Sequence, residues 1–244
     1  MELIDLFANY FLLLSNDYLL MTISLSLFIF SKQKDHTHLI LMLLFSMIYK
    51  TILKDVFQSP ALSTSPTLNF GFPSGHINFA TIFYGWLIIT YKSKKLFCLS
   101  LAAMILTGWG ILHMGYHDKN DLLLTPIFAI ILITIYKTFL LKLKKEKILM
   151  ILMMIALICQ LFSIYLIGYV KCDMIIGSYG ILGFGLSNAI HTHQYKNLLL
   201  PIGFLVLFFI ISETSMQFIK NSIWTVMFAI SYFLKLYSLQ FKTV

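Results

Sequence analysis

The sequence predicts an all-α membrane protein, a polytopic helical bundle of about nine spans, and three observations lead to this class. Hydrophobic residues make up 59% of the 244 residues and charged residues only 11%, whereas a soluble domain carries about a quarter charged residues. The mean hydropathy of +0.86 is too high for one buried core, so lipid must contact much of the surface. The apolar runs are long and do not alternate with polar residues, which favours helices over the strands of a barrel.

Nine apolar runs are long enough, or nearly so, to cross a hydrocarbon core about 30 Å thick. We expect these spans at residues 8–30, 38–54, 75–92, 96–113, 121–141, 147–169, 172–190, 197–213 and 217–238. The seventh run is rich in glycine, which permits close contact between membrane helices. The eighth contains Pro201 and is one of the two weakest candidates.

Lysines gather in alternate connections between these runs, and this distribution predicts the orientation. One set of connections, together with the C-terminal end, holds Lys32, Lys34, Lys92, Lys94, Lys95, Lys142, Lys144, Lys145, Lys147, Lys196, Lys235 and Lys242. The opposite connections hold only Lys50, Lys54, Lys119, Lys171 and Lys220. Positively charged loops stay on the cytoplasmic side. We therefore expect a cytoplasmic C-terminus, with the N-terminus and the second set of connections on the non-cytoplasmic side.

The charge and the cysteines exclude several other classes. The net charge of +8 comes entirely from lysine, since the sequence has no arginine, and it fits cytoplasmic loops beside anionic lipid rather than a nucleic-acid partner. Cys98, Cys159 and Cys172 are scattered without CxxC spacing, so neither a disulfide framework nor a zinc motif is predicted. We expect no cofactor, and the sequence predicts no particular oligomeric state.

Two non-cytoplasmic connections hold a group of polar residues that can converge at one membrane face. Its members are Lys54, Pro73, Ser74, Gly75, His76, His117 and Asp121. Ionisable residues at the ends of spans are costly unless they are paired or hydrated, so a convergent group is a functional candidate. His117 and Asp121 are four residues apart and share one face if a helix begins here. The carboxylate would then accept the Nδ1 proton of His117 and leave Nε2 as a nucleophile.

The remaining members supply the other parts of a phosphoryl-transfer site. Ser74 and Gly75 precede the third span, where amide groups at a helix N-terminus bind anions and glycine lets the backbone approach a phosphate. His76 can protonate a departing alkoxide, and Lys54 offers a fixed positive charge to phosphate oxygens. This combination predicts transfer through a phosphohistidine, with no metal required.

These motifs resemble the type 2 phosphatidic acid phosphatase family, which includes bacterial lipid phosphatases and glucose-6-phosphatase. Lys54 matches the lysine of the family's first motif, and Pro73-Ser74-Gly75-His76 matches the second completely. His117 and Asp121 match the end of the third. The resemblance covers roughly residues 38–140 and implies a phosphatase-like membrane core at 1–141. Residues 142–244 would then add membrane spans of unknown role.

The chain departs from the family at the phosphate-gripping arginines. The arginine and proline of the first motif fall on Ala61 and Leu62, and the serine and arginine of the third fall on Gly110 and Ile111. Lysine cannot reproduce the bidentate fork of arginine. Lys119 and Lys50 are possible charge substitutes, although neither stands at a matching position.

The resemblance implies a metal-independent lipid phosphatase that hydrolyses a phosphomonoester or pyrophosphate on the non-cytoplasmic face. Its catalytic residues would be His117, Asp121 and His76, and Lys54, Ser74 and Gly75 would bind the substrate. One alternative is a catalytically weakened member that binds or transports a phospholipid. A second is a metal site, because His113, His117 and Asp121 recur at helical spacing with His76 as a possible fourth ligand. A third is a purely structural role for the His117–Asp121 pair and for Ser74 as a helix cap.

Overall fold

The computed structural model describes residues 3–30, 35–60 and 70–191, and within them every regular element is a helix. The helices are α1 (Leu3–Leu13), α2 (Asp17–Phe30), α3 (Asp35–Phe57), α4 (Gly75–Tyr91), α5 (Lys94–His113), α6 (Lys119–Phe139), η1 (Leu140–Lys142), α7 (Lys145–Ile167) and α8 (Cys172–His191). The all-α prediction is therefore confirmed for this part of the chain. The last two predicted spans, 197–213 and 217–238, lie outside the described residues, as do Ala61 and Leu62.

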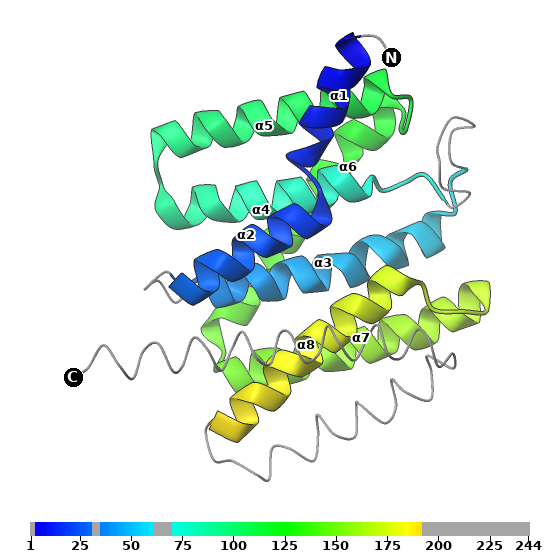
Figure 1. The fold of residues 1–244 in the computed structure, drawn as a ribbon. Coiled ribbons are helices and arrows are strands. Elements are labelled where there is room, and N and C mark those ends of the chain that lie inside the picture. The colour runs from blue at the N-terminus through cyan, green and yellow to red at the C-terminus, as the bar shows by residue number, and fades with distance from the viewer. Residues whose placement is uncertain (1–2, 31–34, 61–69, 192–244) are drawn as a thin grey trace.

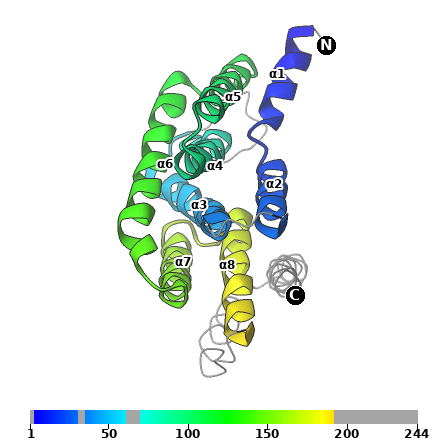
Figure 2. The same cartoon turned by 90° about the vertical axis from the view of Figure 1, so that its left-hand side faces the viewer.

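α3 is the central helix of the bundle. Figure 2, seen from one end of most helices, shows α2, α4, α6, α7 and α8 around it, and each of these helices contacts α3. All side chains from 39 to 44 are fully buried. A helix that is apolar all round is typical of a buried core position. α3 thus packs against protein, and the lysines in its last two turns are held at one end of the core.

The outer helices carry the apolar surface that lipid would cover. Large apolar side chains are exposed along α5, α6 and α7, among them Leu99, Ile105, Leu123, Ile130, Ile158 and Leu161. Within the described residues, four helical stretches are long and apolar enough to cross a membrane: Leu3–Phe30, Lys94–His113, Lys119–Lys142 and Lys145–Ile167. These stretches identify an integral membrane protein, whereas the count of nine spans stays a prediction.

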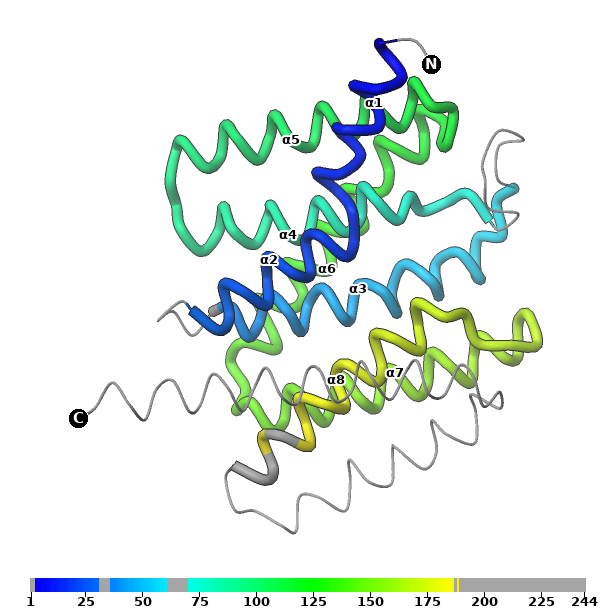
Figure 3. Tube along the Cα trace, in the orientation of Figure 1, coloured from blue at the N-terminus to red at the C-terminus, as the bar shows by residue number. Residues whose placement is uncertain are grey.

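The first predicted span, 8–30, is interrupted in the structure. The N–H groups of residues 14–16 bond to carbonyls three residues back, and Ser15 Oγ donates to the carbonyl of Leu12 at 3.0 Å. The side chain of Asn16 then accepts from the N–H of Leu19 at 3.1 Å, which is the bond of a helix N-cap. Polar residues at 15–17 therefore end α1 and start α2, and the resulting bend is visible in Figure 3.

Close packing accompanies the glycines of α8. A side chain at Gly177 would collide with the backbone carbonyl of Leu44, so α8 approaches the α3 backbone directly. This is the close contact that the glycine content predicts. The chain runs back and forth, so that the end of α3, the start of α4 and the α5–α6 and α7–α8 connections lie at one end of the bundle, on the right in Figure 1. The α4–α5 and α6–α7 connections lie at the other end. The motif-bearing segments therefore share one end.

Candidate functional site

His117 and Asp121 form a direct pair at the turn between α5 and α6. His117 Nδ1 lies 2.9 Å from Asp121 Oδ2, and both side chains are largely buried. α6 begins here because the Asp118 side chain caps it, accepting from the N–H of Asp121 at 2.7 Å. With Nδ1–H donated to the carboxylate, the lone pair of Nε2 is left for another partner.

The electrostatic surroundings of His117 favour its neutral form. Burial lowers the pKa of His117 below its ordinary value, and the positive charges of Lys54 and His76 lower it further, while Asp121 acts in the opposite direction. The direction of the net shift keeps the imidazole neutral at pH 7, as a nucleophile requires. Lys54 and His76 therefore lie within electrostatic range of His117.

The N-terminus of α4 is joined to the same turn. The N–H of Ser74 donates to Thr125 Oγ1 at 3.0 Å, and that hydroxyl donates to the carbonyl of Asp121 at 2.6 Å. Ser74 stands at the N-cap position of α4 but makes no capping bond through its side chain. Its Oγ is fully buried and has no hydrogen-bond partner among the described residues. A buried hydroxyl without a partner is unusual, and it stands beside helix N–H groups that have no partner within α4.

Gly75 and Asn78 are two further residues of interest near the start of α4. A Cβ added at Gly75 would lie 3.3 Å from Lys50 Nζ, so glycine lets an ammonium approach the start of the helix. Asn78 lies one turn after Ser74, is almost completely buried, and neither polar atom of its side chain has a partner in the described part of the chain. Sequence reasoning overlooked Asn78 and Thr125, which lie within apolar runs and match no motif.

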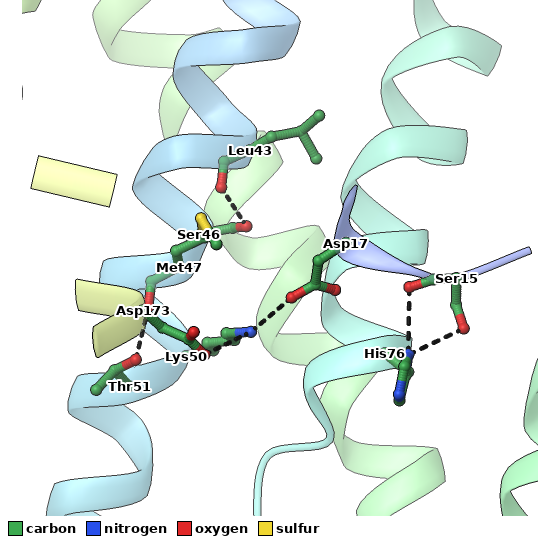
Figure 4. A network of polar contacts seen from close by, with 9 residues as sticks. All are labelled: Ser15, Asp17, Leu43, Ser46, Met47, Lys50, Thr51, His76 and Asp173. Atoms are coloured by element: carbon green, nitrogen blue, oxygen red, sulfur yellow. Dashed lines mark hydrogen bonds and ion pairs between the residues drawn. The ribbon is translucent and has the colours of Figure 1, made fainter. Parts of the chain in front are cut away.

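His76 faces the linker between α1 and α2. Its Nδ1 lies 3.3 Å from both the carbonyl oxygen and the hydroxyl oxygen of Ser15. Since a carbonyl only accepts, Nδ1 carries the proton and Nε2 remains available. Tyr84 Oη donates to the carbonyl of Leu14 at 2.8 Å and ties the same linker to α4. Figure 4 shows His76 and Ser15 beside the ion pairs of the neighbouring lysine, Lys50.

The three candidate lysines have different surroundings. Lys50 is buried and forms ion pairs of 3.0 Å with both Asp17 and Asp173. Lys54, one turn later, is half-buried and makes no ion pair with any described residue. Lys119 is exposed in the first turn of α6. Lys54 is therefore the lysine whose charge is available beside His117, whereas Lys50 is already neutralised.

His113 contacts Asp5, whereas the metal-site alternative requires it to lie with His117 and Asp121. Its Nε2 lies 2.9 Å from Asp5 Oδ1, and its ring stacks on Trp109 with centroids 5.2 Å apart. Across residues 3–30, 35–60 and 70–191, no three His, Cys, Asp or Glu side chains are placed to hold a metal ion. The described geometry thus provides no support for a metal centre at His117.

The two positions at which the chain departs from the third motif, Gly110 and Ile111, are packed against other parts of the protein. A Cβ at Gly110 would lie 3.0 Å from the carbonyl oxygen of Ala8, so α1 occupies the space of a larger side chain. Ile111 is fully buried. Sequence reasoning did not place Asp17 and Asp173 near the motifs. Both form ion pairs with Lys50 at this end of the bundle. Asp17 within the first apolar run and Asp173 at the start of the seventh were the available signal.

No protein-family model, no curated protein and no solved structure matches the chain. The family resemblance consequently depends on the motif residues themselves.

Proposed function

We propose that the protein is a membrane phosphatase that hydrolyses a lipid phosphate, either a phosphomonoester or a pyrophosphate, through a phosphohistidine. The observation that carries the proposal is the buried His117–Asp121 pair, with Nδ1–H donated at 2.9 Å, beside the uncapped N-terminus of α4. We call Lys54, Ser74, His76, His117 and Asp121 the catalytic cluster.

The geometry supports a two-step mechanism. His117 Nε2 attacks phosphorus, the bond to the leaving oxygen breaks, and His76, in its doubly protonated form, gives its Nε2 proton to that oxygen to release an alcohol. Water then attacks the phosphohistidine, with His76 taking its proton, and inorganic phosphate departs. Asp121 stabilises the charge that develops on the His117 imidazole. The first-turn amides of α4, Ser74 Oγ and Lys54 donate to the phosphate oxygens as charge builds on them.

The position of the catalytic cluster supports the proposal of a lipid substrate. The cluster lies at one end of a bundle whose outer helices expose apolar side chains, and phosphate headgroups lie at the ends of membrane spans. The lysine distribution in the sequence supports a non-cytoplasmic location for the cluster and the N-terminus, with a cytoplasmic C-terminus. We propose that topology together with nine spans in the whole chain.

The topology has a direct test. In a variant without Cys98, Cys159 and Cys172, single cysteines at Lys119 and Lys94 report the two ends of the bundle. A membrane-impermeant maleimide added to intact cells should label the Lys119→Cys protein and spare Lys94→Cys until the membrane is opened. The reverse pattern would place the catalytic cluster in the cytoplasm.

The proposed activity is tested by phosphate release from a panel of lipid phosphates by the purified protein. His117→Ala should abolish release. His113→Ala is the matched control, because His113 lies in the same region but pairs with Asp5, and it should retain most of the activity. Equal release by the wild type and His117→Ala would remove His117 as the nucleophile.

A weakened member that binds or transports phospholipid is the second candidate. It is favoured by the absence of arginine from the sequence and by the pairing of Lys50 with two aspartates. Vanadate, which imitates the phosphate, separates the candidates. The phosphatase should bind vanadate and lose it in Lys54→Ala, whereas lipid binding without vanadate binding or turnover would favour the second candidate.

A further inference from the structure

The linker between α1 and α2 makes two contacts with one histidine of the catalytic cluster. The carbonyl oxygen and the hydroxyl oxygen of Ser15 each lie 3.3 Å from His76 Nδ1, and Ser15 is fully buried. Figure 4 shows the imidazole with one nitrogen toward Ser15 and the other pointing away from the linker. Since the motifs occur only within residues 38–140, a segment of the chain that carries no motif reaches the candidate site.

Both oxygens of Ser15 act as acceptors toward His76. The Ser15 hydroxyl donates its proton to the carbonyl of Leu12 at 3.0 Å, so the lone pairs of Oγ are left for the imidazole. A carbonyl oxygen also only accepts. Nδ1 must therefore carry a proton, which it shares between the two oxygens in a three-centre hydrogen bond. In the opposite tautomer the lone pair of Nδ1 would face two buried acceptors and leave them without a donor, which is costly.

Two further contacts hold the linker in this position. Tyr84 Oη donates to the carbonyl of Leu14 at 2.8 Å, and Tyr84 belongs to α4, the helix whose first turn contains the histidine. At the other end of α1, Asp5 Oδ1 lies 2.9 Å from His113 Nε2 on α5. Because the α1–linker segment is bound to both α4 and α5, its two acceptors have a fixed position relative to the imidazole.

The proposed mechanism requires the tautomer that this contact enforces. In the first step the His76 imidazolium gives its Nε2 proton to the leaving oxygen, which leaves a neutral ring with its remaining proton on Nδ1. In the second step water attacks phosphorus, the bond from phosphorus to His117 Nε2 breaks, and the water proton goes to the lone pair of His76 Nε2. If the remaining proton were on Nε2, that nitrogen could not accept it. Loss of the group that fixes a histidine tautomer strongly lowers turnover in serine proteases.

We infer that Ser15 is a positioning residue of the active site, whose two oxygens hold the Nδ1 proton of His76 and confine proton exchange to Nε2. The N-terminal helix pair α1–α2, which lies outside the motif-bearing region, thereby becomes part of the catalytic machinery. This inference rests on the proposed function for the role of Nε2 in turnover, whereas the tautomer of His76 is measurable without turnover.

The tautomer is measured by nitrogen NMR of the full-length protein in detergent, with isotopically labelled histidine, at alkaline pH where imidazoles are neutral. The signal that disappears in His76→Gln belongs to His76. We expect a proton on Nδ1 in the wild type and a mixture of both tautomers in the double variant Ser15→Ala, Tyr84→Phe. Ser24→Ala is the matched control, because Ser24 is also fully buried and its hydroxyl makes the same kind of local bond, to the carbonyl of Leu20 at 2.7 Å. A wild-type signal with the proton on Nε2 would overturn the inference.

The role in turnover is tested with an alkyl-chain nitrophenyl phosphate, because nitrophenolate leaves without needing a proton. The initial burst of nitrophenolate reports formation of the phosphohistidine, and the steady rate that follows reports its hydrolysis. Ser15→Ala should keep the burst rate of the wild type and lower the steady rate about fivefold, the usual effect of one hydrogen bond. Tyr84→Phe, which does not touch His76, should show the same split to a smaller extent, and it carries the test if Ser15→Ala does not fold. Ser24→Ala should leave both rates unchanged.

The outcomes distinguish this inference from the proposed function. An equal loss of burst and steady rate in Ser15→Ala would indicate a general loosening of the site and would overturn the positioning role, as would no loss in either rate. The phosphatase would stand in both cases. If the wild type releases no nitrophenolate but its His76 tautomer depends on Ser15, the phosphatase is overturned and Ser15 remains the residue that fixes this histidine.

Discussion

Lys50 and Lys54 lie one helical turn apart near the end of α3, but the charge of Lys50 is neutralised by ion pairs and that of Lys54 is not. Lys50 is 4% exposed and is held between Asp17 and Asp173. Lys54 has no ion pair among the described residues and lies close enough to His117 to lower the pKa of that imidazole. The first lysine fixes helices α2 and α8 to the core, and the second leaves an unneutralised charge beside a potential nucleophile.

This difference indicates which donors are available to bind a phosphate in a chain that has no arginine. A dianion entering the cluster must find donors that are not already engaged, because breaking an existing buried ion pair is costly. Lys54, Ser74 Oγ and the first amides of α4 meet that condition, and Lys50 does not. The comparison therefore predicts loss of stability from one lysine and loss of phosphate chemistry from the other.

The largest expected effect is on stability. Lys50→Met should lower the free energy of unfolding by about 3–5 kcal/mol, because it leaves Asp17 and Asp173 facing each other without a cation. Lys119→Met, at an exposed lysine, should change it by no more than about 0.5 kcal/mol. Both are measured by thermal or denaturant unfolding in the same detergent. Equal stability of the two variants would mean that the Lys50 network contributes nothing to the fold.

The next effect is on turnover. Lys54→Met should reduce phosphate release by about 10²–10³-fold, the usual cost of removing one donor that stabilises developing charge. Its thermal unfolding should stay near that of the wild type, since Lys54 has no ion pair to lose within the described structure. A Lys54→Met protein with wild-type turnover would contradict the role given to this charge.

Ser74→Ala should produce a smaller effect that separates stability from binding. The Ser74 hydroxyl is buried without a partner in the described residues, so removing it breaks no hydrogen bond and should not destabilise the fold. If Oγ donates to the phosphate, vanadate binding should weaken about tenfold. Unchanged vanadate affinity would show that the hydroxyl does not face the phosphate.

The smallest effect is a displacement of the pH profile. Burial and the charges of Lys54 and His76 lower the pKa of His117, and only the neutral imidazole can attack. Activity should therefore persist above the lowered pKa and fall about tenfold per pH unit below it. At pH 6.5, where an ordinary histidine is half protonated, less than half of the rate should be lost. In Lys54→Met the residual activity should show this acid limb at higher pH, and an unmoved limb would argue against the electrostatic contact.

Local sequence patterns predicted much of the helical bundle, but they could not predict contacts between residues far apart in the sequence. Unbroken apolar runs located the helices, because burying them in lipid or protein requires internal backbone bonding. The spacing of His117 and Asp121 predicted their contact, although His117 lies two residues before the start of α6 and not on its face. The partnership of Lys50 with Asp173 joins residues far apart in sequence, and nothing local distinguishes Lys50 from Lys54. The interruption of the first span was missed because residues 15–17 stand within a strongly apolar run.

The central claim is that His117 carries the phosphoryl group, and trapping that intermediate tests it most directly. The purified protein is mixed with a labelled lipid phosphate, quenched in alkali within the first turnovers, digested, and analysed by mass spectrometry under conditions that preserve phosphohistidine. We expect the label on the peptide containing His117, acid-labile and alkali-stable, and absent from Lys54→Met, which should form it too slowly to accumulate. Label on His76, or steady phosphate release with no labelled histidine in rapid-quench samples, would contradict the mechanism.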